Sequence, residues 1–121
     1  MMAARLSQID YSREMALVAT SLNSTSEILA VARLIGDPDN ERAEFAVFVR
    51  SDLKGRGLGY ALMTEILAYA RKRGLQTVFG DVLRENTTML QMAKELGFVL
   101  KPSASPETVE VTLDLTAPPR N

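Results

Sequence analysis

The chain has 121 residues, a formal net charge of −1 and a hydrophobic content of 46%, and it contains neither cysteine nor histidine. A chain of this length is expected to fold as a single domain, residues 1–121, and to bury a sizeable core. The missing residue types exclude disulfides, thiolate chemistry, histidine-dependent catalytic triads and most zinc sites, so no metal is expected. A catalytic base must therefore be a carboxylate, a lysine, a tyrosine or a water molecule.

The near-neutral charge gives no strong attraction to nucleic acid or to an anionic membrane, so we expect neither as a partner. No apolar run approaches the ~18 residues that a membrane span needs. The first residues also lack the long apolar region of a signal peptide. These features together predict a cytoplasmic location.

The first half of the chain is predicted to form strands joined by polar turns. Residues 1–12 are hard to assign and are compatible with a short helix of about two turns. The apolar run at 13–20 fits a strand or a short helix, and the polar cluster S-L-N-S-T-S after it favours a strand. A second strand at 27–35 and a third at 42–50 flank the turn sequence G-D-P-D-N-E and form an antiparallel hairpin. The third strand is apolar on both faces, which is typical of a central strand covered on both sides.

The third strand runs into K-G-R-G-L-G, a loop with three glycines that opens an amphipathic helix. Glycine removes the side chain where a backbone must turn sharply or be approached closely. The first amides of a helix have no intrahelical acceptor and lie at the positive end of the helix dipole. Strand, loop and helix N-terminus together therefore predict a site for a phosphate or pyrophosphate.

The second half of the chain continues the alternation of helices and strands. The helix at 57–73 ends in basic residues followed by Gly74, which suits its C-terminal cap. A strand at 77–83 completes a βαβ unit, so we expect it to lie parallel to the strand at 42–50. Asn86 is a candidate N-cap for the next helix. The remaining elements are a helix at 87–96 that Gly97 ends, a strand that starts at 98–100, an alternating strand at 108–115 and a tail at 116–121.

The order of these motifs resembles the GNAT superfamily of N-acetyltransferases. Lys54, Gly57 and Gly59 fall on the family signature (Gln/Arg)-x-x-Gly-x-(Gly/Ala), with lysine in place of the usual first residue. Downstream, E-N-T-T-M-L-Q-M-A-K-E-L-G-F is similar to the second family motif. The strings I-D-Y-S-R-E-M-A-L-V-A, A-E-F-A-V and K-G-R-G-L-G-Y-A-L-M are similar to the acetyltransferase domain of bacterial protein lysine acetyltransferases. The resemblance covers residues 13–115 and implies an α+β fold with α/β/α layers, in which a mixed central sheet contains a β-hairpin, a βαβ unit and a second helix.

The resemblance also implies that the bound anion is the pyrophosphate of acetyl-CoA. Amides of residues 55–60 would hold it, and Lys54 and Arg56 would add positive charge. The strand at residues 47–49 would pair with the pantetheine amides through its backbone, and Gly80 would allow close approach of a ligand or of another backbone. Asn86 would cap its helix, contact the cofactor, or do both. The expected cofactor-binding residues are Val47, Phe48, Val49, Lys54, Gly55, Arg56, Gly57, Leu58, Gly59, Tyr60 and Asn86.

Glu44 is an acid inside the otherwise apolar strand R-A-E-F-A-V. Burial would raise the pKa of its carboxyl group, which suits a general base, and the resemblance also points to a base glutamate on this strand. The alternative for Glu44 is an ion pair with Arg42 or Arg33, and Glu27 is a second candidate base. Many family members carry a tyrosine as general acid seven residues after the asparagine of the second motif, where this chain has Ala93.

The predicted reaction is acetyl transfer from acetyl-CoA to a primary amine. The resemblance favours a protein lysine as the acceptor, with acyl-CoA synthetases among the implied targets. Two alternatives stay open: acetylation of a small amine or amino acid, and a non-catalytic module that senses acetyl-CoA. Family domains usually begin with further strand and helix elements, so the N-terminus is expected to be truncated, and a homodimer would cover the apolar sheet surface left bare.

Overall fold

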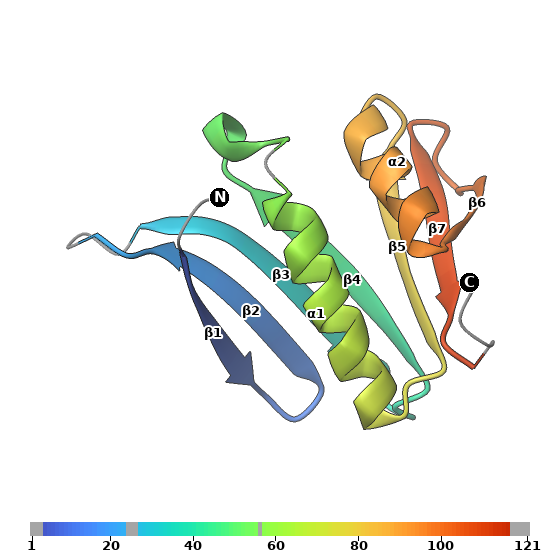
Figure 1. Ribbon diagram of the computed structural model, residues 1–121. Coiled ribbons are helices and arrows are strands. Elements are labelled where there is room, and N and C mark those ends of the chain that lie inside the picture. Colours follow the sequence, from blue (N-terminus) through green and yellow to red (C-terminus); the bar gives the residue numbers. More distant parts are fainter. Residues whose placement is uncertain (1–3, 24–26, 56, 117–121) are drawn as a thin grey trace.

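The computed structural model describes residues 4–23, 27–55 and 57–116, and this part forms one mixed sheet with α-helices on one face (Figure 1). The strands lie in the order β1-β2-β3-β4-β5-β7-β6, and all neighbours are antiparallel except β4 and β5. The predicted hairpin, βαβ unit and second helix are confirmed. The elements are β1 (Ala4–Asp10), β2 (Glu14–Ser21), β3 (Ile28–Gly36), β4 (Arg42–Val49), the 3-10 turn η1 (Ser51–Leu53), α1 (Leu58–Arg73), β5 (Thr77–Leu83), α2 (Thr87–Leu96), β6 (Val99–Pro102) and β7 (Thr108–Asp114).

Burial alternates along the strands because the helices cover only one face of the sheet. On β4, Ala43 and Phe45 are buried beneath the helices, whereas Arg42 and Glu44 are exposed on the other side. No helix of the described residues lies on that second side, which we call the open face. The expectation that β4 is covered on both sides is therefore wrong for the described part of the chain, and the apolar Phe48 is 60% exposed.

The first described residues form a strand and not the short helix with which their composition is compatible. β1 pairs with β2 along its whole length, from Ala4 opposite Ser21 to Asp10 opposite Met15. A helix of about two turns is marginal in water, whereas the edge of β2 offers a continuous row of backbone hydrogen-bonding partners. The sheet therefore begins at Ala4, before the expected start of the core at Arg13.

β4 and β5 pair over a short stretch, from Arg42 opposite Thr77 to Glu44 opposite Phe79, and then separate (Figure 1). The ring of Phe45 lies just beyond the last pair, and a Cβ atom on Gly80 would come within 2.7 Å of it. Gly80 therefore makes room for an aromatic side chain, whereas a ligand or another backbone was expected there. Phe45 also meets Phe98 edge-to-face, with 5.4 Å between the ring centroids.

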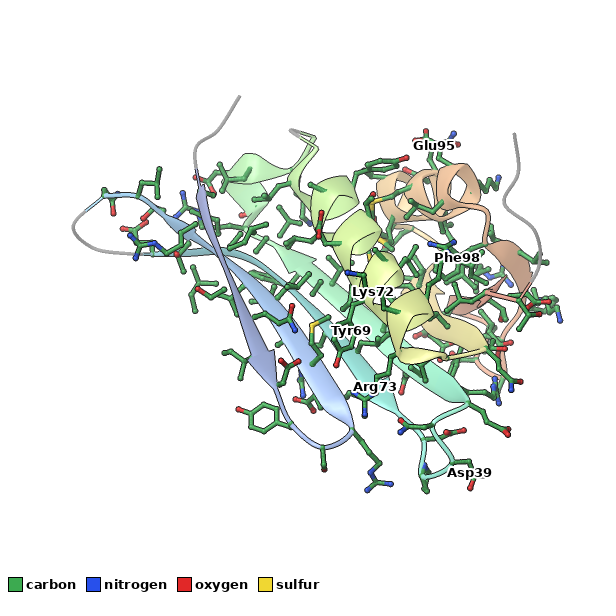
Figure 2. All side chains as sticks on the ribbon, turned by 60° about the horizontal axis from the view of Figure 1, so that its bottom comes forward. Asp39, Tyr69, Lys72, Arg73, Glu95 and Phe98 are labelled. Atoms are coloured by element: carbon green, nitrogen blue, oxygen red, sulfur yellow. The ribbon has the colours of Figure 1, made fainter. Side chains whose placement is uncertain are left out.

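The helix α1 packs on β3 and β4 through a buried stripe that includes Leu62 and Ile66. It ends at Gly74 as predicted, with φ of 84° in the left-handed region. Near this end, Arg73 donates to the hydroxyl of Tyr69 at 3.0 Å, and Figure 2 shows the two side chains together. A second bond from Arg73 to the carbonyl of Ser12, at 2.7 Å, ties this end of α1 to the β1–β2 turn. The other end of α1 is left beside the opening between β4 and β5.

Candidate active site

A cleft of about 810 Å³ lies where β4 and β5 separate. One wall is formed by the end of β4, the glycine loop and the first turn of α1, and the other by α2 and the residues before it. Arg56 lies outside the described residues. All other expected cofactor-binding residues line this cleft, namely Val47, Phe48, Val49, Lys54, Gly55, Gly57, Leu58, Gly59, Tyr60 and Asn86.

Sequence reasoning missed most of the wall that α2 contributes. The additional lining residues are Leu53, Glu85, Thr87, Thr88, Met89, Gln91, Met92 and Glu95. Among them, Thr88, Gln91, Met92 and Glu95 have the three- and four-residue spacing of a single helix face, which was the signal available in the sequence. On this face Gln91 donates to Glu95 at 3.2 Å.

The glycines of the loop have two different structural roles. Gly55 and Gly57 have φ values of 83° and 80°, which side-chain-bearing L residues rarely adopt. A Cβ atom on either would meet nothing within 4 Å, so the backbone conformation, not crowding, requires glycine there. Gly59 has no positive φ, but a Cβ atom on it would lie 3.3 Å from the side chain of Val49. The first two glycines therefore allow the backbone conformation of the loop, and the third allows the start of α1 to lie close to Val49 on β4.

The N-terminus of α1 presents unsatisfied backbone donors to the cleft. The first intrahelical bond runs from the N–H of Ala61 to the carbonyl of Gly57, at 3.0 Å. No side chain caps this helix, and the N–H groups of residues 58–60 donate to no acceptor in the part of the chain that the structure describes. Lys54 is exposed on the same wall. Free amides at the positive end of a helix, beside an ammonium group, suit a phosphate or pyrophosphate.

Alternate residues of β4 direct their backbone groups toward the cleft. The N–H of Arg50 donates to the carbonyl of Leu29 on β3 at 2.9 Å. The even-numbered residues of β4 therefore form the hydrogen-bonded pairs with β3. In an antiparallel ladder, residues between hydrogen-bonded pairs turn their N–H and C=O groups away from that partner. On β4 these are Phe45, Val47 and Val49, and β5 pairs with none of them. Val47 and Val49 thus offer backbone donors and acceptors to a ligand, whereas the backbone of Phe48 is used by β3.

The opposite wall begins at Asn86, which is the N-cap of α2, as predicted. Its side-chain Oδ1 accepts a hydrogen bond from the N–H of Met89 at 3.1 Å. This bond satisfies one of the donors that α2 would otherwise present to the cleft. Across the cleft, Tyr60 is 44% exposed on the first turn of α1.

Glu44 lies where β4 and β5 begin to separate, because its pair with Phe79 is the last in the β4–β5 ladder. It is not among the residues that line the cleft, of which the nearest on β4 is Val47. Its side chain is exposed on the open face, so the expectation of a buried acid is wrong: no described helix covers this side of β4. The two neighbouring arginines have other partners. Arg33 donates to Glu14 at 2.9 Å, and Arg42 stacks on the Phe79 ring at 4.5 Å from its centroid. Among the described residues, no hydrogen bond or ion pair holds the Glu44 carboxylate.

Glu27 lies at the other end of β4, next to Arg50. Its carboxylate accepts from Arg50 at 2.8 Å, and Arg50 also donates to Asp52 at 2.6 Å. The bonds to Asp52 and Glu27 hold the pKa of the Arg50 guanidinium above its usual value. Since Arg50 and Glu44 are six residues apart on an extended chain, Glu27 and Glu44 are separated by roughly 20 Å. The structure therefore does not bring the two candidate bases into one site.

The described residues contain no group of three or more His, Cys, Asp or Glu side chains that could hold a metal ion. Within the same residues, neither helix is long and apolar enough to span a bilayer.

The chain that carries this glycine loop and cleft matches a known family. The sequence model of the acetyltransferase (GNAT) family matches residues 2–98 of the chain. The chain belongs to this family. Structural likeness agrees: the GNAT domain of PAT from S. lividans superposes with a TM-score of 0.75 at 28% identity, over 88% of this chain and 63% of that one. A cAMP-binding acyltransferase from Mycobacterium smegmatis gives 0.75 at 29% identity, over 92% of this chain and 33% of the other.

Curated GNAT relatives are longer proteins. Acetyltransferase Pat of Mycolicibacterium smegmatis is 32% identical over 95 residues, which are 78% of this chain and 28% of Pat. An L-methionine sulfoximine/L-methionine sulfone acetyltransferase of Pseudomonas aeruginosa is 33% identical over 55 residues, which are 46% of this chain and 32% of that protein. The chain thus spans about a third or less of these relatives.

One GNAT position is altered in a way that the structure explains. Ala93 stands where many family members have the tyrosine acid, and it is fully buried at 0% exposure in the core beneath α2. A tyrosine here would have to displace core side chains or change the position of α2. In the described part of this GNAT domain, the tyrosine that does line the cleft is Tyr60 on the opposite wall.

Proposed function

We propose that this GNAT domain transfers an acetyl group from acetyl-CoA to the side-chain amine of a protein lysine, with Glu44 as general base. The observation that carries the proposal is the position of Glu44, whose unpartnered carboxylate stands where β4 and β5 separate. The cleft behind it leads along β4 to the uncapped N-terminus of α1. In this proposal the thioester would lie beyond Val47, at the end of the cleft nearer to Glu44.

The residues of the cleft fit coenzyme A in chemistry and in order. The free amides at residues 58–60 and the ammonium group of Lys54 would hold the pyrophosphate. The unpaired backbone groups of Val47 and Val49 would pair with the amides of the pantetheine arm, much as a neighbouring strand would. Bound coenzyme A supplies the activated thioester, and β4 would aim it toward Glu44.

Glu44 would supply the proton acceptor that the reaction needs. A lysine ammonium group cannot attack a carbonyl until it loses a proton, which Glu44 would take directly or through a water molecule. A backbone N–H at Val47 or Val49 would donate to the carbonyl oxygen as negative charge develops on it. The C–N bond forms, the C–S bond breaks, and the sulfur leaves as a thiolate that water can protonate. The buried Ala93 leaves no tyrosine acid on that side.

The shape of the acceptor side favours a large substrate. Glu44, Ala46 and Phe48 follow one another on the open face, and all three are exposed. In the described residues no helix encloses this side, so a lysine on the surface of a folded protein can reach Glu44. The likeness to Pat and to the PAT domain supports the same choice. So does the string A-E-F-A-V around Glu44, which is similar to bacterial protein lysine acetyltransferases.

A second candidate function is acetylation of a small amine or amino acid. It is favoured by the likeness to the methionine sulfoximine acetyltransferase, which spans 46% of this chain. To separate the two acceptors, labelled acetyl-CoA would be incubated with the purified domain and either an acyl-CoA synthetase or a panel of free amino acids and amines. Label on synthetase lysines supports the protein acceptor, and label confined to the free amines supports the second candidate.

The catalytic role is tested by Glu44→Gln, which removes the proton acceptor and keeps the shape. We expect kcat/KM to fall by about 10²–10⁴-fold, while the Kd for coenzyme A stays unchanged. The matched control is Glu110→Gln on β7, which lies on the same face two strands away. Equal activity of Glu44→Gln and the parent would rule out Glu44 as the base. A parent that binds coenzyme A and acetylates nothing would point to a sensor.

A further inference from the structure

In the part of the chain that the structure describes, the outer strand β1 ends the sheet with one edge unpaired. It is the terminal strand in the order β1-β2-β3-β4-β5-β7-β6, and its residues from Arg5 to Asp10 are all exposed. The N–H of Tyr11 donates to the carbonyl of Glu14 at 2.7 Å. Hydrogen-bonded pairs alternate along an antiparallel ladder, so the odd-numbered residues of β1 form their backbone hydrogen bonds with β2. Ala4, Leu6, Gln8 and Asp10 therefore turn their backbone N–H and C=O groups to the free edge.

The two edges of the sheet differ in how well they are protected. β6 at the far edge is four residues long and contains Lys101 and Pro102, both of which discourage pairing with another strand. β1 has seven residues, no proline, no lysine and no shift of register against β2. It also exposes two large apolar side chains, Leu6 at 51% and Ile9 at 43%. A long, regular and partly apolar edge of this kind is a template for a further strand.

The helices leave this edge accessible. α1 packs on β3 and β4, and Figure 1 shows β1 projecting beyond it on the side away from α2. A strand that approached β1 in the plane of the sheet would meet no helix of the described residues. The neighbouring molecule therefore needs only an extended segment with a matching edge.

We propose that β1 pairs with β1 of a second copy of this chain, antiparallel and about a two-fold axis at Ser7. The middle of the seven-residue strand is Ser7, so full overlap pairs Ala4 with Asp10 and Leu6 with Gln8 of the other copy. These are the residues whose backbone groups face the free edge, and the register therefore uses every one of them.

Charge supports the antiparallel direction. β1 carries Arg5 near its start and Asp10 at its end. A parallel pair would bring the two basic ends together and the two acidic ends together, whereas the antiparallel pair sets the basic end of one copy beside the acidic end of the other. The two sheets would join into one, with both helix layers on the same side. A single strand pair buries a small area, so the dimer is expected to dissociate on dilution.

The register is tested by single cysteines, which the cysteine-free chain allows without background. In the proposed dimer, Ser7 lies opposite Ser7 of the second copy in a non-hydrogen-bonded pair. The two Cα atoms would be about 4.5 Å apart. Ser7→Cys should therefore form a disulfide-linked dimer under mild oxidation. Gln8→Cys is the matched control, since its two copies are offset diagonally by roughly 7–8 Å, and it should cross-link at least about tenfold more slowly. Equal rates for the two variants would overturn the proposed register.

The edge itself is tested by Gln8→Pro, which removes an N–H that points to the free edge and spares the bonds from β1 to β2. Sedimentation velocity over a range of concentrations should show a monomer–dimer equilibrium for the parent and for Gln8→Thr, and monomer alone for Gln8→Pro. Circular dichroism checks that each variant keeps the fold. A parent that is monomeric at every concentration, or a Gln8→Pro variant that still dimerises, would overturn the proposal. Either result leaves the proposed acetyl transfer untouched.

Discussion

The two helices begin on opposite walls of the same cleft, and their N-termini are capped differently. Each helix follows a strand of the sheet, α1 after β4 and α2 after β5. Asn86 caps α2 by accepting from the N–H of Met89 at 3.1 Å. α1 starts at Gly57 without any side-chain cap. Among the described residues, a side chain thus satisfies a donor at the start of α2 and none does so at α1, which supports the proposal that α1 is the anion-binding end of the cleft.

The residues around α1 keep its amides open in three ways. Gly57 offers no side chain to fold back onto the first turn, and its φ of 80° turns the loop aside. Lys54 is a donor and not an acceptor, so it cannot cap the helix. The first turn of α1 contains no acidic side chain that could accept from its amides. The same is true of α2, where the acceptor is the Asn86 side chain. In the proposed complex, the wall that binds the phosphates is therefore the one whose helix begins with glycine, and the wall of the capped helix does not bind them.

Among substitutions at the two helix N-termini, the largest effect on coenzyme A binding is expected from Gly57→Ala. An L residue held in the left-handed region is strained by about 1–2 kcal/mol, and the new methyl group would stand in the open space of the loop. If the loop relaxes to relieve the strain, the amides of α1 lose their alignment. We expect the Kd for coenzyme A, measured by calorimetry, to rise by about tenfold or more.

The control for this change is Gly74→Ala at the other end of the same helix. Gly74 has φ of 84°, and a Cβ atom on it would also meet nothing within 4 Å. The same strain should lower the thermal stability of both variants by a similar amount, while Gly74→Ala keeps the affinity for coenzyme A. Similar affinities for the two variants would show that the loop conformation does not matter for binding.

Local signals in the sequence predicted much of this arrangement. Gly74 and Gly97 end the helices as expected, Asn86 caps α2, and the glycine loop lies between β4 and α1. These features depend on neighbours within a few residues along the chain, such as a positive φ or a side chain that accepts from the N–H three residues later. The glycine loop and the second motif were therefore found without knowledge of the rest of the fold.

Features that depend on distant segments were predicted less well. β1 is a strand only because the edge of β2 completes its hydrogen bonds, and its own sequence gives no strong period. Glu44 looked buried because its neighbours on β4 are apolar, but burial depends on what covers each face, and no described helix covers this one. The outer face of α2 was missed because its polar residues are typical of any exposed helix face.

A smaller effect is expected at the capped helix. Asn86→Ala leaves the N–H of Met89 without its acceptor, and we expect a loss of about 1 kcal/mol in the free energy of unfolding. In a domain of this size the Tm should fall by roughly 3–6 °C, measured by calorimetry. Asn86→Ser restores an acceptor and lacks the amide, so it should recover most of the stability.

The same pair of variants decides whether Asn86 also contacts coenzyme A. If the side-chain amide binds the cofactor, Asn86→Ser will be stable and will still bind coenzyme A more weakly than the parent. Parent-like affinity in Asn86→Ser would restrict Asn86 to its capping role. Parent-like stability in Asn86→Ala would contradict the cap itself.

The smallest effect is expected from Lys54→Ala. Its ammonium group is exposed to solvent, so its attraction for a phosphate is screened, and the amides of α1 remain in place. We expect the Kd for coenzyme A to rise by roughly two- to fivefold at low salt, and the difference from the parent to shrink as salt is added. Lys72→Ala, an exposed lysine near the C-terminal end of α1, removes the same charge far from the cleft and should leave the affinity unchanged. If instead Lys54→Ala weakened binding more than Gly57→Ala, the pyrophosphate would be held mainly by side-chain charge, and the open amides of α1 would not be what separates the two helix starts.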